Sequence, residues 1–143
     1  MGHVSAIFIK KDRESPRQEI TEGEFKENYG LVGDVNSAEG PRQVCLLRKE
    51  DRDLVTLDSR NGLCFGRFLE TVQIEGIPLE TLTKDSWFRI GDAILKVTVI
   101  GKKCWPDCEI IHSKSTCALP KAARFMGVLE SGIIRVGDEV TAI

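Results

Sequence analysis

The amino-acid sequence lacks the features that mark several classes of protein. No apolar run approaches the roughly 18 residues that a membrane-spanning helix needs. Charge of one sign is not in excess, because 20 lysines and arginines face 22 aspartates and glutamates, for a net charge of −2. This balance leaves no large basic field to attract a nucleic-acid backbone. We therefore expect neither a membrane nor a nucleic acid among the partners.

A secretory signal is also missing from the printed sequence. Residues 1–10 have no basic stretch before their short apolar run and no small-residue cleavage site. We therefore expect a cytoplasmic protein whose five cysteines, an odd number, are reduced thiols rather than a disulfide framework. Cys45 and Cys64 stand between apolar neighbours and are predicted to pack as small hydrophobic side chains.

Short β-branched or alternating runs, separated by turn residues, dominate what is present. The length of 143 residues suits a single domain, 1–143. No long amphipathic pattern offers a crossover helix, so an all-β barrel or sandwich is favoured over alternating strands and helices. Strands are predicted at 4–9, 44–47, 68–74, 93–100, 125–130 and 133–136 and from 139, with a weak candidate at 54–57, a loop over 11–28 that permits one short strand, and a short turn or helix at 78–82.

One short pattern occurs twice. Arg89-Ile90-Gly91-Asp92 returns as Arg135-Val136-Gly137-Asp138, each copy followed by further strand-forming residues. Gly-Asp is favourable turn chemistry, so we interpret each copy as strand, tight turn, strand rather than as a solenoid repeat.

Several segments resemble a known family when they are taken in order. They are residues 30–34, 42–44, 89–93, the Gly-Lys-x-Cys segment at 101–104, Cys108, residues 117–120, Phe125, Val128 and residues 136–138. Together they resemble the MOSC family, the domain found at the C-terminus of molybdenum cofactor sulfurases, in its small stand-alone form.

The resemblance implies a β-barrel related to that of pyruvate kinase, and a role with sulfur or the molybdenum cofactor. It makes Cys104 the expected sulfur carrier or molybdenum ligand. The chain also departs from the family: Asn36 stands where His is frequent, Thr71 follows Glu70 where Asn is frequent, and the segment 120–127 lacks the family's Glu and last Arg.

The chemistry of Cys104 depends on its ionisation. Only a thiolate attacks a persulfide or binds a metal, and an ordinary cysteine, with a pKa of about 8.5, is mostly protonated at neutral pH. Nearby cations lower that pKa, and Lys102 and Lys103 directly precede Cys104. A half-buried cysteine beside two solvated lysines is the alternative.

The same region permits a zinc site. Cys104, Cys108, His112 and Cys117 follow one another at separations of four, four and five positions, and three thiolates with one imidazole make a tetrahedral zinc ligand set. Structural zinc usually draws paired ligands from two elements, so we rank this hypothesis below a thiol-based role. It would make the protein a non-enzymatic, zinc-stapled interaction module.

Candidate anion-binding residues are Arg42 and Lys102, because the molybdenum cofactor carries a phosphate and arginine pairs with phosphate through two donors. An ion pair of Arg42 with an acid of residues 50–53 is the alternative. Asp34 is a binding candidate through the resemblance alone, and Trp105 is either an aromatic wall for a pterin or a cap on the core.

We therefore expect a protein that binds a molybdopterin-type molecule or carries sulfur, with a cysteine desulfurase or a molybdoenzyme as a partner. No pyridoxal-phosphate domain is present in this chain, so a desulfurase would be another protein. Whether the chain is itself an enzyme stays open at this point.

Overall fold

The computed structural model describes residues 2–12, 14–35, 37–40, 43–51, 70–100 and 123–143. Within them the strands are β1 (Gly2–Ile9), β2 (Gln18–Ile20), β3 (Glu22–Lys26), β4 (Gly30–Leu31), β5 (Val44–Arg48), β6 (Val72–Glu75), β7 (Trp87–Ile90), β8 (Ala93–Ile100), β9 (Arg124–Glu130), β10 (Gly132–Arg135) and β11 (Glu139–Ala142), and a 3₁₀ turn, η1, spans Leu79–Thr81.

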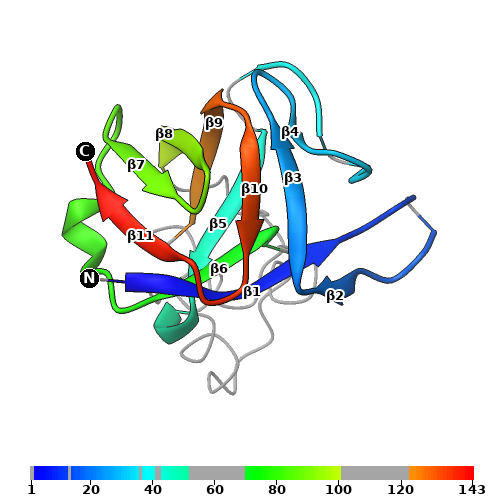
Figure 1. Cartoon of the computed structure of the whole chain (residues 1–143), viewed down its shortest axis with the longest axis horizontal. Coiled ribbons are helices and arrows are strands. Elements are labelled where there is room, and N and C mark those ends of the chain that lie inside the picture. The colour runs from blue at the N-terminus through cyan, green and yellow to red at the C-terminus, as the bar shows by residue number, and fades with distance from the viewer. Residues whose placement is uncertain (1, 13, 36, 41–42, 52–69, 101–122) are drawn as a thin grey trace, which may run out of the picture.

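Seven strands close into a barrel. Hydrogen bonding runs in the order β11-β7-β8-β9-β5-β6-β1, and β11 pairs with β1 to complete the ring. Strand β2 pairs with the C-terminal end of β1. Every neighbouring pair is antiparallel except β5 and β6, which are parallel. The two ends of the chain lie on the same side of the molecule in Figure 1, as the pairing of Gly2 with Val140 requires. The predicted all-β barrel is confirmed.

Alternation along the strands fills the barrel interior. On β7, Phe88 and Ile90 are buried while Trp87 and Arg89 are exposed, which is the period of two that a strand imposes. On β8, buried Leu95 and Val97 follow the same rule, but the register with β9 shifts between Val97 and Val99. Such a bulge leaves Val99 only half-buried, although strict alternation predicts a side chain that faces inward.

A second sheet lies beside the barrel (Figure 1), with the strand order β10-β3-β4. The segment 11–28, predicted as a loop that permits one short strand, contains two strands, β2 and β3. Only Phe25 is fully buried on β3, while Glu22, Glu24 and Lys26 are exposed, so the strand has almost no apolar signal. Strand β3 forms because its backbone pairs with that of β10.

The two Arg-x-Gly-Asp copies pack against each other at their turns. The backbone N–H of Arg135 donates to Asp138 Oδ2 at 2.7 Å, and the Asp138 carboxylate lies against Gly91 of the other copy. Gly91 has a φ of +57°, and a side chain there would meet that carboxylate. The repeat is therefore explained by turn geometry.

No helix long and apolar enough to cross a bilayer occurs in the part of the chain that the structure describes.

Candidate functional site

The strand register defines two ends of the barrel. At one end β8 finishes at Ile100 and β9 starts at Arg124, and these two residues are paired. Arg124 is also the neighbour of Leu46 on β5, so Arg48, two residues further on, lies at the same end. We call this the Ile100 end. The opposite end, where Gln43 precedes β5, is called the Gln43 end.

Arg48 and Asp51 form a bidentate ion pair at the Ile100 end. Arg48 Nε donates to Asp51 Oδ2 at 2.6 Å and Nη2 donates to Oδ1 at 2.9 Å. A third donor, Nη1, reaches the carbonyl oxygen of Ile77 at 3.0 Å. Asp51 is buried, and its hydrogen bond raises the pKa of Arg48 above the ordinary value, so this guanidinium stays charged.

Arg124 is the second cation at this end, and it is 6% exposed. Its Nε donates to the carbonyl of Leu82 at 2.7 Å, and its Nη1 donates to the carbonyl of Ala123 at 3.1 Å. Burial lowers the pKa of Arg124 below the ordinary value; the Asp51 carboxylate opposes this shift and the Arg48 charge adds to it. The three side chains are therefore close enough to act on one another electrostatically.

These contacts fasten the β6–β7 connection across the Ile100 end. Ile77 and Leu82 both belong to that connection, on either side of η1, and each offers its carbonyl to one of the two arginines. Both residues are buried. Strand β8 ends and β9 begins at this same end.

Asp34 lies at the Gln43 end, where it is 8% exposed. Its Oδ1 accepts the backbone N–H of Lys10 at 2.8 Å, and the N–H of Val35 donates to the Lys10 carbonyl at 2.7 Å. The carboxylate therefore joins the turn after β4 to the end of β1. A binding role for Asp34 stays a prediction.

Glu70, just before β6, belongs to a further buried network. Its Oε1 pairs with Arg17 Nη1 at 2.7 Å, and its Oε2 accepts from Gln73 Nε2 at 3.2 Å. The Arg17 guanidinium lies 3.9 Å from the centre of the Phe8 ring. The network ties the segment before β2 to the outer face of the barrel.

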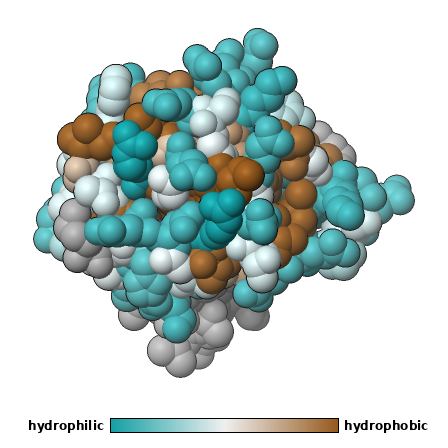
Figure 2. Space-filling view, viewed as in Figure 1, coloured by the Kyte–Doolittle hydropathy of each residue, from teal (hydrophilic) through white to brown (hydrophobic). Residues whose placement is uncertain are grey.

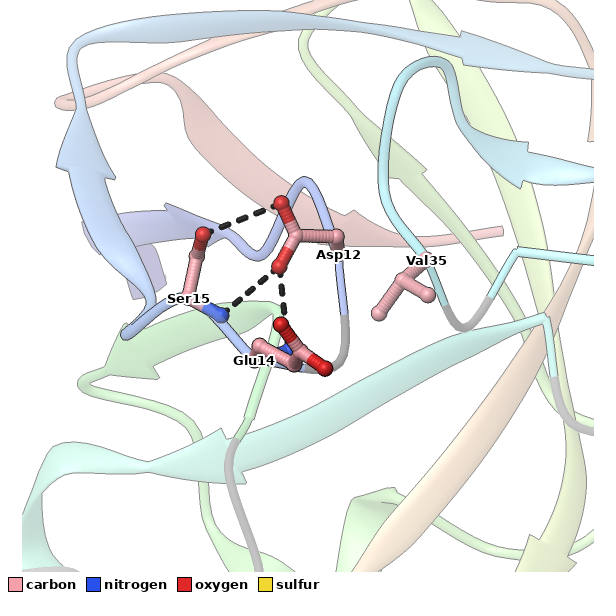
Figure 3. A pocket seen from close by; sticks show the side chains of 4 residues that line it. All are labelled: Asp12, Glu14, Ser15 and Val35. Carbon is pink, nitrogen blue, oxygen red and sulfur yellow. Dashed lines mark hydrogen bonds between the residues drawn. The ribbon is translucent and has the colours of Figure 1, made fainter.

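A shallow hollow near Val35 is lined by Asp12, Glu14 and Ser15 (Figure 3). The Ser15 hydroxyl donates to Asp12 Oδ2 at 3.0 Å, and the backbone N–H of Ser15 donates to Oδ1 at 2.7 Å. These bonds keep the pKa of the Asp12 carboxyl below its ordinary value, and the bond from the Ser15 hydroxyl has the largest effect. The carboxylate thus completes a local turn.

Most of the candidate residues lie outside the described residues. Cys45 is described, and its side chain is half-buried on β5 between the buried Val44 and Leu46. No three His, Cys, Asp or Glu side chains come together as a metal site within the described ranges. The residues outside are Arg42, Cys64, Lys102, Cys104, Trp105, Cys108, His112 and Cys117.

Sequence reasoning missed the roles of Arg48, Arg124 and Arg17. Arg48 offered a usable signal in the sequence, since it directly follows the predicted strand 44–47 and precedes Asp51 by three residues. The partners of the other two are remote, 42 positions away for Arg124 and Leu82 and 53 for Arg17 and Glu70. Figure 2 shows mostly hydrophilic side chains on the visible face, with apolar ones scattered between them.

No family model and no curated protein matches the chain. Solved structures do share its fold. The YuaD protein from Bacillus subtilis aligns with a TM-score of 0.70 and 18% identity over 98% of this chain and 94% of its own. YiiM from Geobacillus stearothermophilus aligns with a TM-score of 0.69 and 13% identity over 100% of this chain and 75% of its own.

A structure described as a hypothetical protein also matches, with a TM-score of 0.69 and 18% identity over 99% of this chain; the chain spans 66% of its length. At these identities the likeness is one of fold, and it agrees with the barrel that the resemblance implied.

Proposed function

We propose that this MOSC-like barrel acts through the thiol of Cys104, either as a carrier of sulfur or as the ligand of molybdenum in a molybdopterin cofactor. One observation supports the proposal: β8 ends at Ile100, four residues before Cys104 in the sequence, at the barrel end where Arg48 and Arg124 lie. A cationic surrounding favours the thiolate form that both roles need.

The sulfur-carrier role requires one exchange step. The Cys104 thiolate attacks the outer sulfur of a donor persulfide, so a new S–S bond forms on Cys104 while the donor's S–S bond breaks. The donor leaves as a thiolate, and the proton of the outer sulfur stays on the new Cys104 persulfide. A cysteine desulfurase would supply the donor persulfide, and a molybdoenzyme would receive the sulfur.

In the cofactor-binding role, molybdenum would supply Lewis-acid and redox chemistry, and Cys104 would bind it. Lys102 is the proposed phosphate contact nearest to Cys104 in the sequence, with Trp105 as an aromatic wall. Asp34 lies at the Gln43 end, away from the Ile100 end, so Asp34 and Arg42 stay ligand candidates through the resemblance and the chemistry of phosphate alone.

The described residues fit an anionic group in chemical type, because guanidinium is the cation best suited to phosphate. The hydrogen bonds described for Arg48 and Arg124 go to protein acceptors. We therefore assign these two arginines to holding the barrel end and to its electrostatic field, and the direct ligand contacts to the 101–122 segment.

A sulfur-transfer assay tests the proposal. The protein is incubated with a low-molecular-weight persulfide, and each cysteine is then mapped by mass spectrometry. We expect the persulfide on Cys104 in the wild type and in the matched control Cys45→Ser, and its loss in Cys104→Ser. Equal transfer to Cys104→Ser would refute the carrier role.

A further inference from the structure

A row of three side chains that can bind metal crosses the outer face of the barrel near the chain ends. His3 on β1 is directly opposite Glu75 on β6 and Glu139 on β11, because β1 lies between these two strands (Figure 1). Each of the three is next to a buried residue on its own strand and is itself not buried, so all three face outward. Directly opposite residues of antiparallel strands have Cβ atoms about 4.5–5.5 Å apart. The two glutamates therefore flank the histidine from both sides.

His3 and Glu75 are already in contact. Nε2 of the imidazole lies 2.6 Å from Oε1 of the carboxylate, and the two side chains are 50% and 34% exposed. Among the described residues, neither Glu75 nor Glu139 forms an ion pair with a lysine or an arginine. Both carboxylates can therefore accept a cation from solvent without giving up a basic partner.

Glu139 is the third potential ligand and lies further away. As the side chains stand it forms no ion pair with His3, and within the described ranges no three metal-binding side chains are in reach of one ion. Glu139 is exposed, however, so packing does not hold its side chain in place. Its backbone is already fixed opposite His3 by the pairing of β11 with β1. A rotation about its own side-chain bonds is the change that would bring the carboxylate to the imidazole.

We propose that His3, Glu75 and Glu139 bind a divalent cation of the zinc type, at the seam where β11 closes the barrel on β1. One imidazole nitrogen and two carboxylates are ligands that zinc takes, at about 2.0–2.2 Å, and three protein ligands leave the fourth position to water. Two ligands of a tetrahedral ion at that distance are about 3.4 Å apart, so the contact between His3 and Glu75 has to widen by less than about 1 Å. The site uses no cysteine and is independent of the proposed function of Cys104.

A zinc titration of the full chain, followed by two-dimensional amide NMR, both tests and locates the site. We expect the shifts to concentrate at His3, Glu75 and Glu139 and their neighbours on the three strands. His3→Ala and Glu139→Gln should each weaken zinc binding there at least about tenfold, because loss of a group that only supports a ligand already costs about 10- to 100-fold. Glu19→Gln, at an exposed glutamate on β2, is the matched control and should leave the affinity unchanged.

The position of the shifts separates this site from zinc bound by thiols. Shifts that lie away from β1, β6 and β11, or an unchanged affinity at this site in His3→Ala, would overturn the inference. An affinity lost in His3→Ala but kept in Glu139→Gln would overturn the three-ligand arrangement. All the replaced side chains are exposed, so each variant should fold, and circular dichroism checks this.

Discussion

Replacing Arg17 by methionine removes the cation that faces the buried carboxylate of Glu70. The Glu70 side chain is 0% exposed and the Arg17 side chain is 24% exposed, with 2.7 Å between Nη1 and Oε1. Arg17 also donates to the Glu70 backbone carbonyl at 3.0 Å. Methionine keeps the apolar length of the side chain over Phe8 and removes only the charge and the donors.

The expected cost follows from the burial of the pair. Removing one partner of a fully buried pair costs about 3–5 kcal/mol, whereas an exposed pair contributes about 0–1 kcal/mol. Because one partner is partly exposed, we expect Arg17→Met to lower the free energy of unfolding by about 2–3 kcal/mol. In a chain of this size that corresponds to a Tm lower by roughly 6–10 °C.

Urea denaturation followed by circular dichroism measures this cost. In a Glu70→Gln background, Arg17→Met should cost only about 1 kcal/mol, because no buried charge is then left behind. Arg89→Met serves as the surface control. If Arg17→Met and Arg89→Met had the same unfolding free energy, the ion pair would have no stabilising role and the reasoning would be refuted.

Three further predictions concern turns and metal. Gly132→Ala should cost about 1–3 kcal/mol in urea melts because its Cβ would meet the backbone of Asp92 and Ala93, whereas the control Gly127→Ala, with its nearest atom at 3.4 Å, should be near neutral. Ser15→Ala should raise the pKa of Asp12 toward 3.8 in an NMR titration; because folding lowers this pKa, its stabilising contribution is present above pH 3.8 and is lost as the pH falls through the lower folded value. Dialysis against a strong chelator should leave the thermal melting curve unchanged, and a collapse restored only by zinc would favour the zinc-stapled alternative.

The strand pattern of the barrel could be predicted from local sequence. Buried strands such as β1, β5 and β8 have β-branched or alternating residues that predict a strand. The two Gly-Asp turns mark positions where the chain reverses direction. Strand β3 could not be predicted in this way, since it contains two glutamates, a glycine and a lysine and only one apolar side chain, that of Phe25. Its existence depends on β10, about a hundred residues later.

The polar contacts were harder to predict than the strands. The hydrogen bonds from Arg124 to Leu82 and from Arg17 to Glu70 form only because the barrel closes. No local spacing in the sequence predicts these two contacts. Asp34 was a candidate through the resemblance alone, and its described hydrogen bond, accepted from the Lys10 backbone N–H, joins the turn after β4 to the end of β1. Cys45 was expected to pack as a small hydrophobic side chain, and on β5 it is half-buried between the buried Val44 and Leu46.

Mass spectrometry of the protein purified from its natural host, under non-reducing and non-chelating conditions, tests the central claim most directly. Intact-mass and peptide analysis would read both bound groups and the state of each thiol. The account predicts a molybdopterin-type molecule bound to the chain or a persulfide on Cys104. One zinc ion per chain, with unmodified Cys104 among its ligands, would contradict it, because thiolates in a closed tetrahedral site are no longer available as carriers.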